Sequence, residues 1–195
     1  MEGMRNLKNI CVYCAASANI NSAYIEAAHK LGALFASNHY NVICGAGRTG
    51  LMGAVTRGAL EAGGKVIGVI PEFMVENGWA YSGLSEMVTT PDMHSRKEIM
   101  ADRADAAVAL PGGCGTFEEL LEIITWKQLG LFHKPIIILN INNYYSPLIE
   151  MLNKAIEEGF MKPSHSTIWH ECTTPDEAVE YLKSDIKEAT LESKY

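Results

Sequence analysis

Short apolar runs alternate with helix-like segments along almost the whole of this 195-residue chain. Some runs are apolar without interruption, as in Ile136-Ile137-Ile138-Leu139. Such runs favour strands of a parallel sheet that is covered on both faces. The candidate strands are residues 10–14, 41–44, 65–70, 86–90, 106–110, 135–140 and 166–170.

Segments with helical spacing lie between most of these runs. In the first, apolar residues recur at the intervals that line one helix face, at Tyr24, Ala28, Leu31 and Phe35. The others span residues 50–62, 94–103, 116–129, 145–158 and 175–187. This alternation predicts a single α/β domain over residues 1–195, with a doubly wound parallel sheet of about seven strands and right-handed crossovers. We expect the polar tail from about residue 188 to fray.

Composition excludes several classes of function. The chain has 16 basic and 23 acidic residues, a net charge of −7, which argues against broad binding of nucleic acid or of anionic membranes. No run approaches the ~20 apolar residues of a membrane span, and residues 1–9 lack a secretory pattern. We therefore expect a cytoplasmic protein.

The five cysteines do not suggest a disulfide framework. Cys11 and Cys14 spell C-x-x-C, but they lie in a candidate strand, where residues three apart point to opposite faces. No spaced set of cysteines and histidines indicates zinc. We expect neither a metal nor another cofactor.

Three loops that follow candidate strands carry chemistry, and the first is glycine-rich. It reads Gly45-Ala46-Gly47-Arg48-Thr49-Gly50-Leu51-Met52-Gly53 and opens a helix. Glycine lets the backbone approach a phosphate closely, and a helix start supplies free N–H groups. The G-x-G-x-x-G pattern and Glu72 would also fit an NAD site, although a strand and a helix precede this loop. A tight turn without a ligand is a further alternative.

The second loop reads Pro111-Gly112-Gly113-Cys114-Gly115-Thr116-Phe117-Glu118-Glu119. Three glycines within four residues cost backbone entropy, which suggests close approach by a ligand. Glu119 has two interpretations. With Thr116 it has the spacing of a capping box. Alternatively, the helix dipole lowers its pKa, and the ionised carboxylate serves a reaction that passes through a sugar cation.

The third loop reads Asp92-Met93-His94-Ser95-Arg96-Lys97 and also opens a helix. Two adjacent cations oppose the dipole of a helix start, so an anion nearby would account for them. Arg96 can bind a phosphate or carboxylate through two hydrogen bonds, and Lys97 offers a point charge. The alternative is a solvated basic turn. The helix after Glu119 is apolar nearly all round, which is typical of deep core or of a subunit interface.

Together these motifs resemble the Lonely guy (LOG) family of cytokinin-nucleotide phosphoribohydrolases, also called lysine decarboxylase-like. The likeness runs from Cys11 to about Phe160. P-G-G-x-G-T-x-x-E, at residues 111–119, is its most specific part. The other matches are Gly50-Leu51-Met52-Gly53, Met93-His94-Ser95-Arg96-Lys97 and Thr125-Trp126-Lys127-Gln128-Leu129-Gly130.

The resemblance implies a Rossmann-like homodimer with its active site at the subunit interface. It implies that Arg96 and Glu119 form the catalytic pair. The nucleotide contacts that it implies are Lys97, Gly112, Gly113, Gly115, Thr116, Glu118 and Thr125. Two residues depart from the family pattern. Ala46 stands where a glycine is usual, and would be restricted if its φ must be positive. Cys114 replaces an aromatic residue.

We therefore expect hydrolysis of the N-glycosidic bond of a nucleoside 5′-monophosphate. Backbone N–H groups of residues 112–116 and 45–50, with Gly45, Gly47 and Gly50, would hold phosphate or ribose. Arg96 would neutralise the phosphate or polarise the leaving group, and Glu119 would stabilise the oxocarbenium ion and activate water. The alternative is a nucleotide- or NAD-binding protein without catalysis. The sequence does not distinguish a cytokinin nucleotide from AMP.

Overall fold

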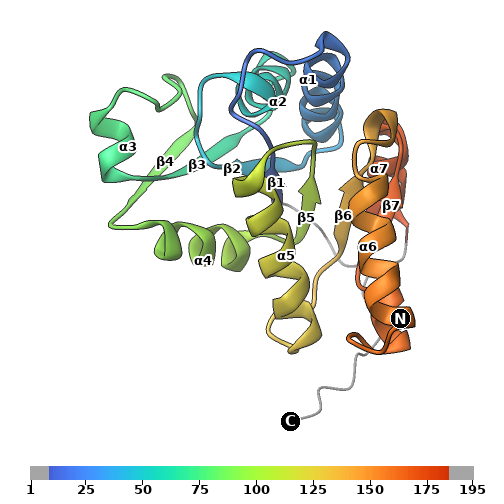
Figure 1. Ribbon diagram of the computed structural model, residues 1–195. Helices are drawn as coiled ribbons and strands as arrows, with labels where there is room; N and C mark the ends of the chain where they lie inside the picture. Colours follow the sequence, from blue (N-terminus) through green and yellow to red (C-terminus); the bar gives the residue numbers. More distant parts are fainter. Residues whose placement is uncertain (1–8, 185–195) are drawn as a thin grey trace, which may run out of the picture.

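Seven parallel strands form one sheet in the computed structural model, which describes residues 9–184 (Figure 1). Their order across the sheet is β4-β3-β2-β1-β5-β6-β7. The strands are β1 (Asn9–Tyr13), β2 (Asn41–Cys44), β3 (Val66–Pro71), β4 (Glu86–Thr90), β5 (Ala106–Ala109), β6 (Ile136–Leu139) and β7 (His170–Cys172). The predicted α/β fold with a parallel sheet of about seven strands is therefore confirmed.

Helices cover both faces of this sheet (Figure 1). One face packs against α1 (Ser22–Ser37), α2 (Gly50–Glu61) and α7 (Pro175–Lys183). The other packs against α4 (Met93–Arg103), α5 (Cys114–Gln128) and α6 (Ser146–Glu157). Side chains alternate along a strand, so β1 sends Val12 to the first face and Tyr13 to the second. Cys11 and Cys14 are likewise buried on opposite faces, as the sequence predicts.

The strand order reverses beside β1, and this reversal positions the site. The chain builds outward from β1 to β4 at one edge, then returns through α4 to β5 on the other side of β1. Loops on the two sides of such a point diverge at the carboxyl ends of the strands and leave a crevice. The loops after β1, β2 and β5 and the start of α4 all meet at this end of the sheet.

Two elements differ from the sequence prediction. Residues 166–170 do not form a strand, because a 3-10 helix occupies Pro163–Thr167 and β7 begins only at His170. There the hydroxyls of Ser166 and Thr167 donate hydrogen bonds to backbone carbonyls three residues earlier, which competes with sheet pairing. A short helix, α3 (Glu72–Glu76), follows β3, where no helical pattern is predicted.

The polar tail from about residue 188 lies outside the described residues, as does the end of the helix expected over 175–187. Within residues 9–184, no helix combines the length and the apolar character needed to cross a membrane.

Candidate active site

Arg96 and Glu119 lie together at the centre of the crevice. Arg96 is in the first part of α4, whose start is fixed by the Asp92 carboxylate accepting a hydrogen bond from the Ser95 N–H at 2.8 Å. Its Nη2 atom is 3.5 Å from Oε1 of Glu119 on α5. The two residues are only 6% and 8% exposed. Arg96 Nε is buried and has no hydrogen-bond partner among residues 9–184, so the hydrogen-bonding capacity of the guanidinium is not fully used within the chain.

Burial raises the pKa of Glu119 to about 7, because the charged form loses its hydration. Arg96 opposes this shift, and the negative charge of Glu118 adds to it. The prediction of a pKa lowered by the helix dipole is therefore wrong. Glu119 lies beyond the first turn of α5, which begins at Cys114, and the dipole acts mainly within that turn. The capping-box interpretation is also wrong, since Gly113 is the N-cap residue.

The first glycine loop packs directly against Arg96. A Cβ atom on Gly45 would lie 1.8 Å from Arg96 Nη2, so only glycine leaves room for the guanidinium there. Ala46 has a φ of +61°, a conformation that costs about 1–2 kcal/mol for a residue with a side chain. The position does require a positive φ, and this chain meets the requirement with alanine. Gly50 has a φ of +60° and shapes the start of α2 without lining the cavity.

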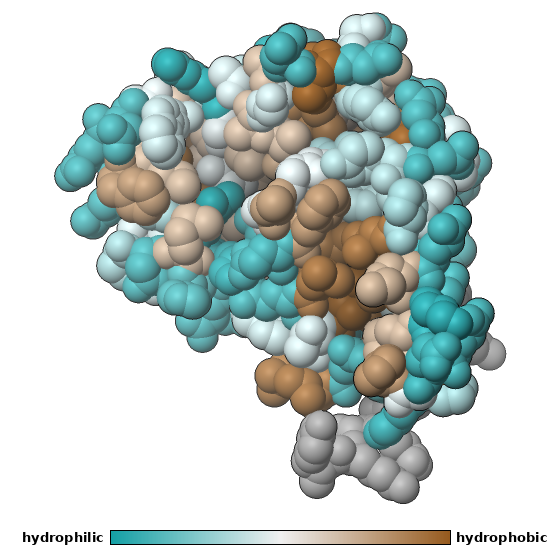
Figure 2. Space-filling view, viewed as in Figure 1, coloured by the Kyte–Doolittle hydropathy of each residue, from teal (hydrophilic) through white to brown (hydrophobic). Residues whose placement is uncertain are grey.

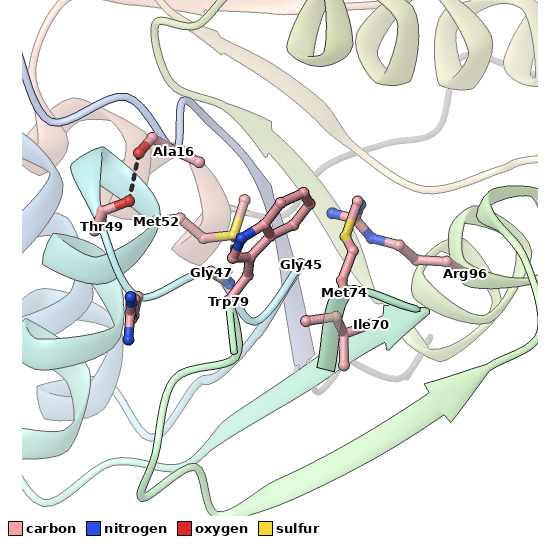
Figure 3. Close-up of a pocket in the computed structure, with 10 residues that line it drawn as sticks. Ala16, Gly45, Gly47, Thr49, Met52, Ile70, Met74, Trp79 and Arg96 are labelled. Atoms are coloured by element: carbon pink, nitrogen blue, oxygen red, sulfur yellow. Dashed lines mark hydrogen bonds between the residues drawn. The ribbon is translucent and has the colours of Figure 1, made fainter. Parts of the chain in front are cut away.

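A cavity of about 440 Å³ lies beside Arg96 (Figure 3). It is lined by Ala16, Gly45, Gly47, Arg48, Thr49, Met52, Ile70, Met74, Trp79 and Arg96. Its walls are mainly apolar, and the Arg96 side chain reaches it from α4 (Figure 3). This combination suits a flat apolar group attached to an anionic one.

Trp79 and Met74 reach the cavity on the segment around α3. The Tyr81 N–H donates a hydrogen bond to the Ala46 carbonyl at 2.7 Å, and Ala80 forms a β-bridge with Gly47. These backbone contacts hold the segment against the first glycine loop. Sequence reasoning missed it because backbone pairing between distant segments leaves no mark in side-chain periodicity.

The second glycine loop leads from β5 into α5. Gly112 is buried against Thr116, and a Cβ atom there would lie 2.1 Å from Thr116 Oγ1. Gly113 and Gly115 are exposed, with open space where a Cβ atom would stand. The start of α5 therefore presents backbone N–H groups to any ligand that lies against these glycines.

Two tyrosines hold the backbone of this loop by donating hydrogen bonds to its carbonyl groups. The Tyr145 hydroxyl donates to the Leu110 carbonyl at 2.8 Å, and the Tyr144 hydroxyl donates to the Gly112 carbonyl at 2.5 Å. Tyr145 is fully buried, and its ring packs edge-on against Tyr144. Nothing in their spacing relative to the glycines marks this role in the sequence.

Other residues expected at the site lie elsewhere. The Lys97 side chain packs against α5, where its Nζ atom donates hydrogen bonds to Glu118 and Glu122. Thr125 donates to the Leu121 carbonyl and lines a second cavity, between α5 and the end of α6, rather than the cavity of Arg96. Within residues 9–184, no group of three or more His, Cys, Asp or Glu side chains could hold a metal ion.

Comparison with known proteins adds to this geometry. Residues 52–182 match the family model described as "Possible lysine decarboxylase". The chain is 40% identical over 183 residues to the Arabidopsis thaliana cytokinin riboside 5′-monophosphate phosphoribohydrolase LOG1, covering 94% of this chain and 86% of that protein. It is 39% identical over 178 residues to a protein of the same name from Rhodococcoides fascians, covering 91% and 90%.

Solved structures share the fold. The crystal structure of TM1055 superposes with a TM-score of 0.73 at 26% identity, covering 91% of this chain and 99% of that one. The molybdenum cofactor carrier protein of Chlamydomonas reinhardtii superposes with a TM-score of 0.70 at 21% identity, covering 91% and 97%. The second likeness concerns the fold alone.

Proposed function

The chain belongs to the possible lysine decarboxylase family, which includes proteins named cytokinin riboside 5′-monophosphate phosphoribohydrolases, and we propose that it hydrolyses a nucleoside 5′-monophosphate at its N-glycosidic bond. The products are the free base and ribose 5-phosphate. The observation that carries this proposal is the buried Arg96–Glu119 pair, enclosed by two glycine loops at the carboxyl ends of the strands.

In the proposed mechanism, the phosphate lies against the N–H groups at the start of α5 and the first glycine loop. The C1′–N bond breaks, its electron pair leaves with the base, and the Glu119 carboxylate stabilises the oxocarbenium ion. Water attacks C1′ and loses a proton to Glu119. The departing base takes a proton from bulk water, and Glu119 returns its proton to solvent before the next turnover. The Arg96 guanidinium offsets negative charge on the phosphate or the departing base.

The base lies, in this proposal, in the apolar cavity beside Arg96, between Met52 and Trp79. AMP and a cytokinin nucleotide share the adenine ring, so both belong to the proposed substrate class. An NAD site has less support, because Glu72, the candidate ribose-binding acid, is exposed and does not line the cavity.

We also propose that the chain acts as a homodimer. Large apolar side chains lie exposed around α5 and α6, and Figure 2 shows brown atoms gathered over this side of the molecule. They are Leu121, Leu129, Leu131, Met151 and Phe160. An apolar surface of this kind is typical of a subunit interface. A second copy seated here would cover the α5 face that carries Glu118 and Thr125.

The cytoplasm is the compartment that we propose. All five cysteines are unpaired, which suits a reducing environment.

The test is product analysis with three nucleotides. We expect the purified chain to release adenine and ribose 5-phosphate from AMP, and the prenylated base from isopentenyladenosine monophosphate, while NAD is left intact. The ratio of kcat/KM for the two monophosphates identifies the preferred base. Calorimetric binding of any of them without base release would instead identify a nucleotide-binding protein that lacks catalysis.

A further inference from the structure

The side chain of Lys97 lies between two carboxylates of α5. Its Nζ atom donates hydrogen bonds to Oε1 of Glu118 and, at 3.0 Å, to Oε1 of Glu122. The side chain is 8% exposed, so these contacts are its main environment. Consecutive residues of a helix point in different directions, so Arg96 faces the cavity while Lys97 faces α5. Lys97 does not line the cavity.

Three carboxylates crowd the same part of α5. Glu118 and Glu122 stand four residues apart, an arrangement in which like charges repel. Glu119 lies between them along the helix, and each of these neighbours makes its ionisation harder. Lys97 has the opposite effect on Glu119. Burial lowers the pKa of Lys97, but its hydrogen bonds to Glu118 and Glu122 outweigh this and raise it, so the ammonium stays charged.

We propose that Lys97 is a positioning residue, which holds Glu118 and Glu122 and offsets their charge so that Glu119 can ionise beside Arg96. This inference rests on the proposed function, in which the Glu119 carboxylate does the chemistry. It departs from the family resemblance, which implies that Lys97 contacts the nucleotide.

Other groups around Glu119 are neutral near pH 7. Those on the strands and on the segment before α6 are thiols and phenols whose pKa values are raised by burial, namely Cys11, Tyr13, Cys14, Cys44 and Tyr145. The charged groups that act on Glu119 are Arg96 and Lys97 from α4 and Glu118 and Glu122 from α5. Arg96 has the larger effect on Glu119, and Lys97 is the cation that pairs with Glu118 and Glu122.

The first experiment measures kcat/KM for AMP against pH in Lys97→Met. Without the ammonium, Glu119 ionises at higher pH, so the acid limb of the profile moves to higher pH. We expect kcat/KM to fall about tenfold near pH 6 and to recover to within about twofold of wild type near pH 9. Adding Glu122→Gln to this variant removes one repelling charge and should move the limb back.

Two further variants keep the test decisive. Lys154→Met removes a lysine that likewise pairs with two glutamates, Glu157 and Glu158, far from the crevice on α6, and should leave the limb in place. If Lys97→Met does not fold, Lys97→Gln decides instead, since an amide can still donate hydrogen bonds to both carboxylates but carries no charge. We expect its acid limb to move to higher pH, and an unchanged limb contradicts the proposal.

A titration of the unligated chain separates this inference from the proposed function. The ¹³C NMR signal of the Glu119 carboxyl, assigned with Glu119→Gln, should titrate at higher pH in Lys97→Met than in wild type. This readout holds whether or not AMP is hydrolysed. The proposal is overturned if the Glu119 titration in Lys97→Met is unchanged and its KM for AMP is raised by the same factor at every pH. Lys97 would then bind the nucleotide directly.

Discussion

Glu119 is the residue at which the proposed chemistry conflicts most with the stability of the fold. It is a carboxylic acid held 8% exposed against a guanidinium, at a nitrogen–oxygen distance of 3.5 Å that is too long for a good hydrogen bond. Because its pKa is about 7, Glu119 is only partly ionised near neutral pH in the free protein, and its carboxyl group is not saturated by Arg96. A nearby anion such as a phosphate would bind to Arg96. A positive charge that develops on the sugar would favour the ionised form of Glu119.

Replacing Glu119 by glutamine should change how stability depends on pH. The pKa of this carboxyl rises from 4.5 to about 7 on folding, so between these values the folded chain binds more protons than the unfolded chain. Its free energy of unfolding therefore falls as pH rises through this window. Relative to wild type, Glu119→Gln should gain about 3 kcal/mol between pH 4 and pH 8. Urea unfolding at several pH values measures this, and a constant difference would refute the raised pKa.

Among the elements, the start of α5 is the one on which the proposed phosphate binding depends. Gly115 is the second residue of this helix, with open space where a side chain would stand. Within the protein alone, alanine would fit there and would favour the helix. The proposed phosphate, lying against the backbone, would account for a glycine at this position.

Gly115→Ala should therefore separate stability from activity. We expect the free energy of unfolding to stay equal or rise by up to about 1 kcal/mol, because alanine restricts the unfolded chain and suits a helix. The same methyl group would obstruct the phosphate, so kcat/KM for AMP should fall at least about tenfold. Thermal unfolding and steady-state kinetics measure the two effects. Wild-type activity in a stable variant would show that no phosphate binds against Gly115.

The elements also show what a sequence can reveal about this protein. The alternation of apolar runs predicts most strands and helices, and glycine with charge at strand ends predicts the Arg96–Glu119 region. The features that the sequence does not predict depend on tertiary contacts. Trp79 reaches the cavity through backbone pairing, and Tyr145 reaches the Leu110 carbonyl from a distant segment. Burial reverses the expected pKa shift of Glu119, because desolvation by the assembled core outweighs the local helix dipole.

For the molecule as a whole, the apolar surface around α5 and α6 is the surface that the proposed second copy would cover. Its side chains flank the helix that carries Glu119, so assembly and catalysis would share one element. At the opposite edge of the sheet, the exposed large apolar side chains are Phe73 and Trp79 on the segment between β3 and β4, and Met87 of β4, which is 48% exposed.

Leu131→Asp should disrupt the proposed homodimer. Leu131 is 69% exposed in the single chain, so aspartate costs the monomer little, but in an interface it would bury a charge without a partner. We expect sedimentation equilibrium to show a dimer of the wild-type chain and a monomer of the variant. Met87→Asp is the matched control and should remain dimeric. A monomeric wild-type chain would contradict the proposal.

Base release from AMP by Glu119→Gln tests whether the Glu119 carboxylate drives cleavage beside Arg96. Glutamine keeps the shape of the side chain but cannot carry the charge, so kcat should fall about 10²- to 10⁴-fold while AMP still binds. Glu98→Gln, an exposed change on α4, should keep wild-type activity. If folded Glu119→Gln releases adenine at the wild-type rate, this carboxylate does not drive the reaction.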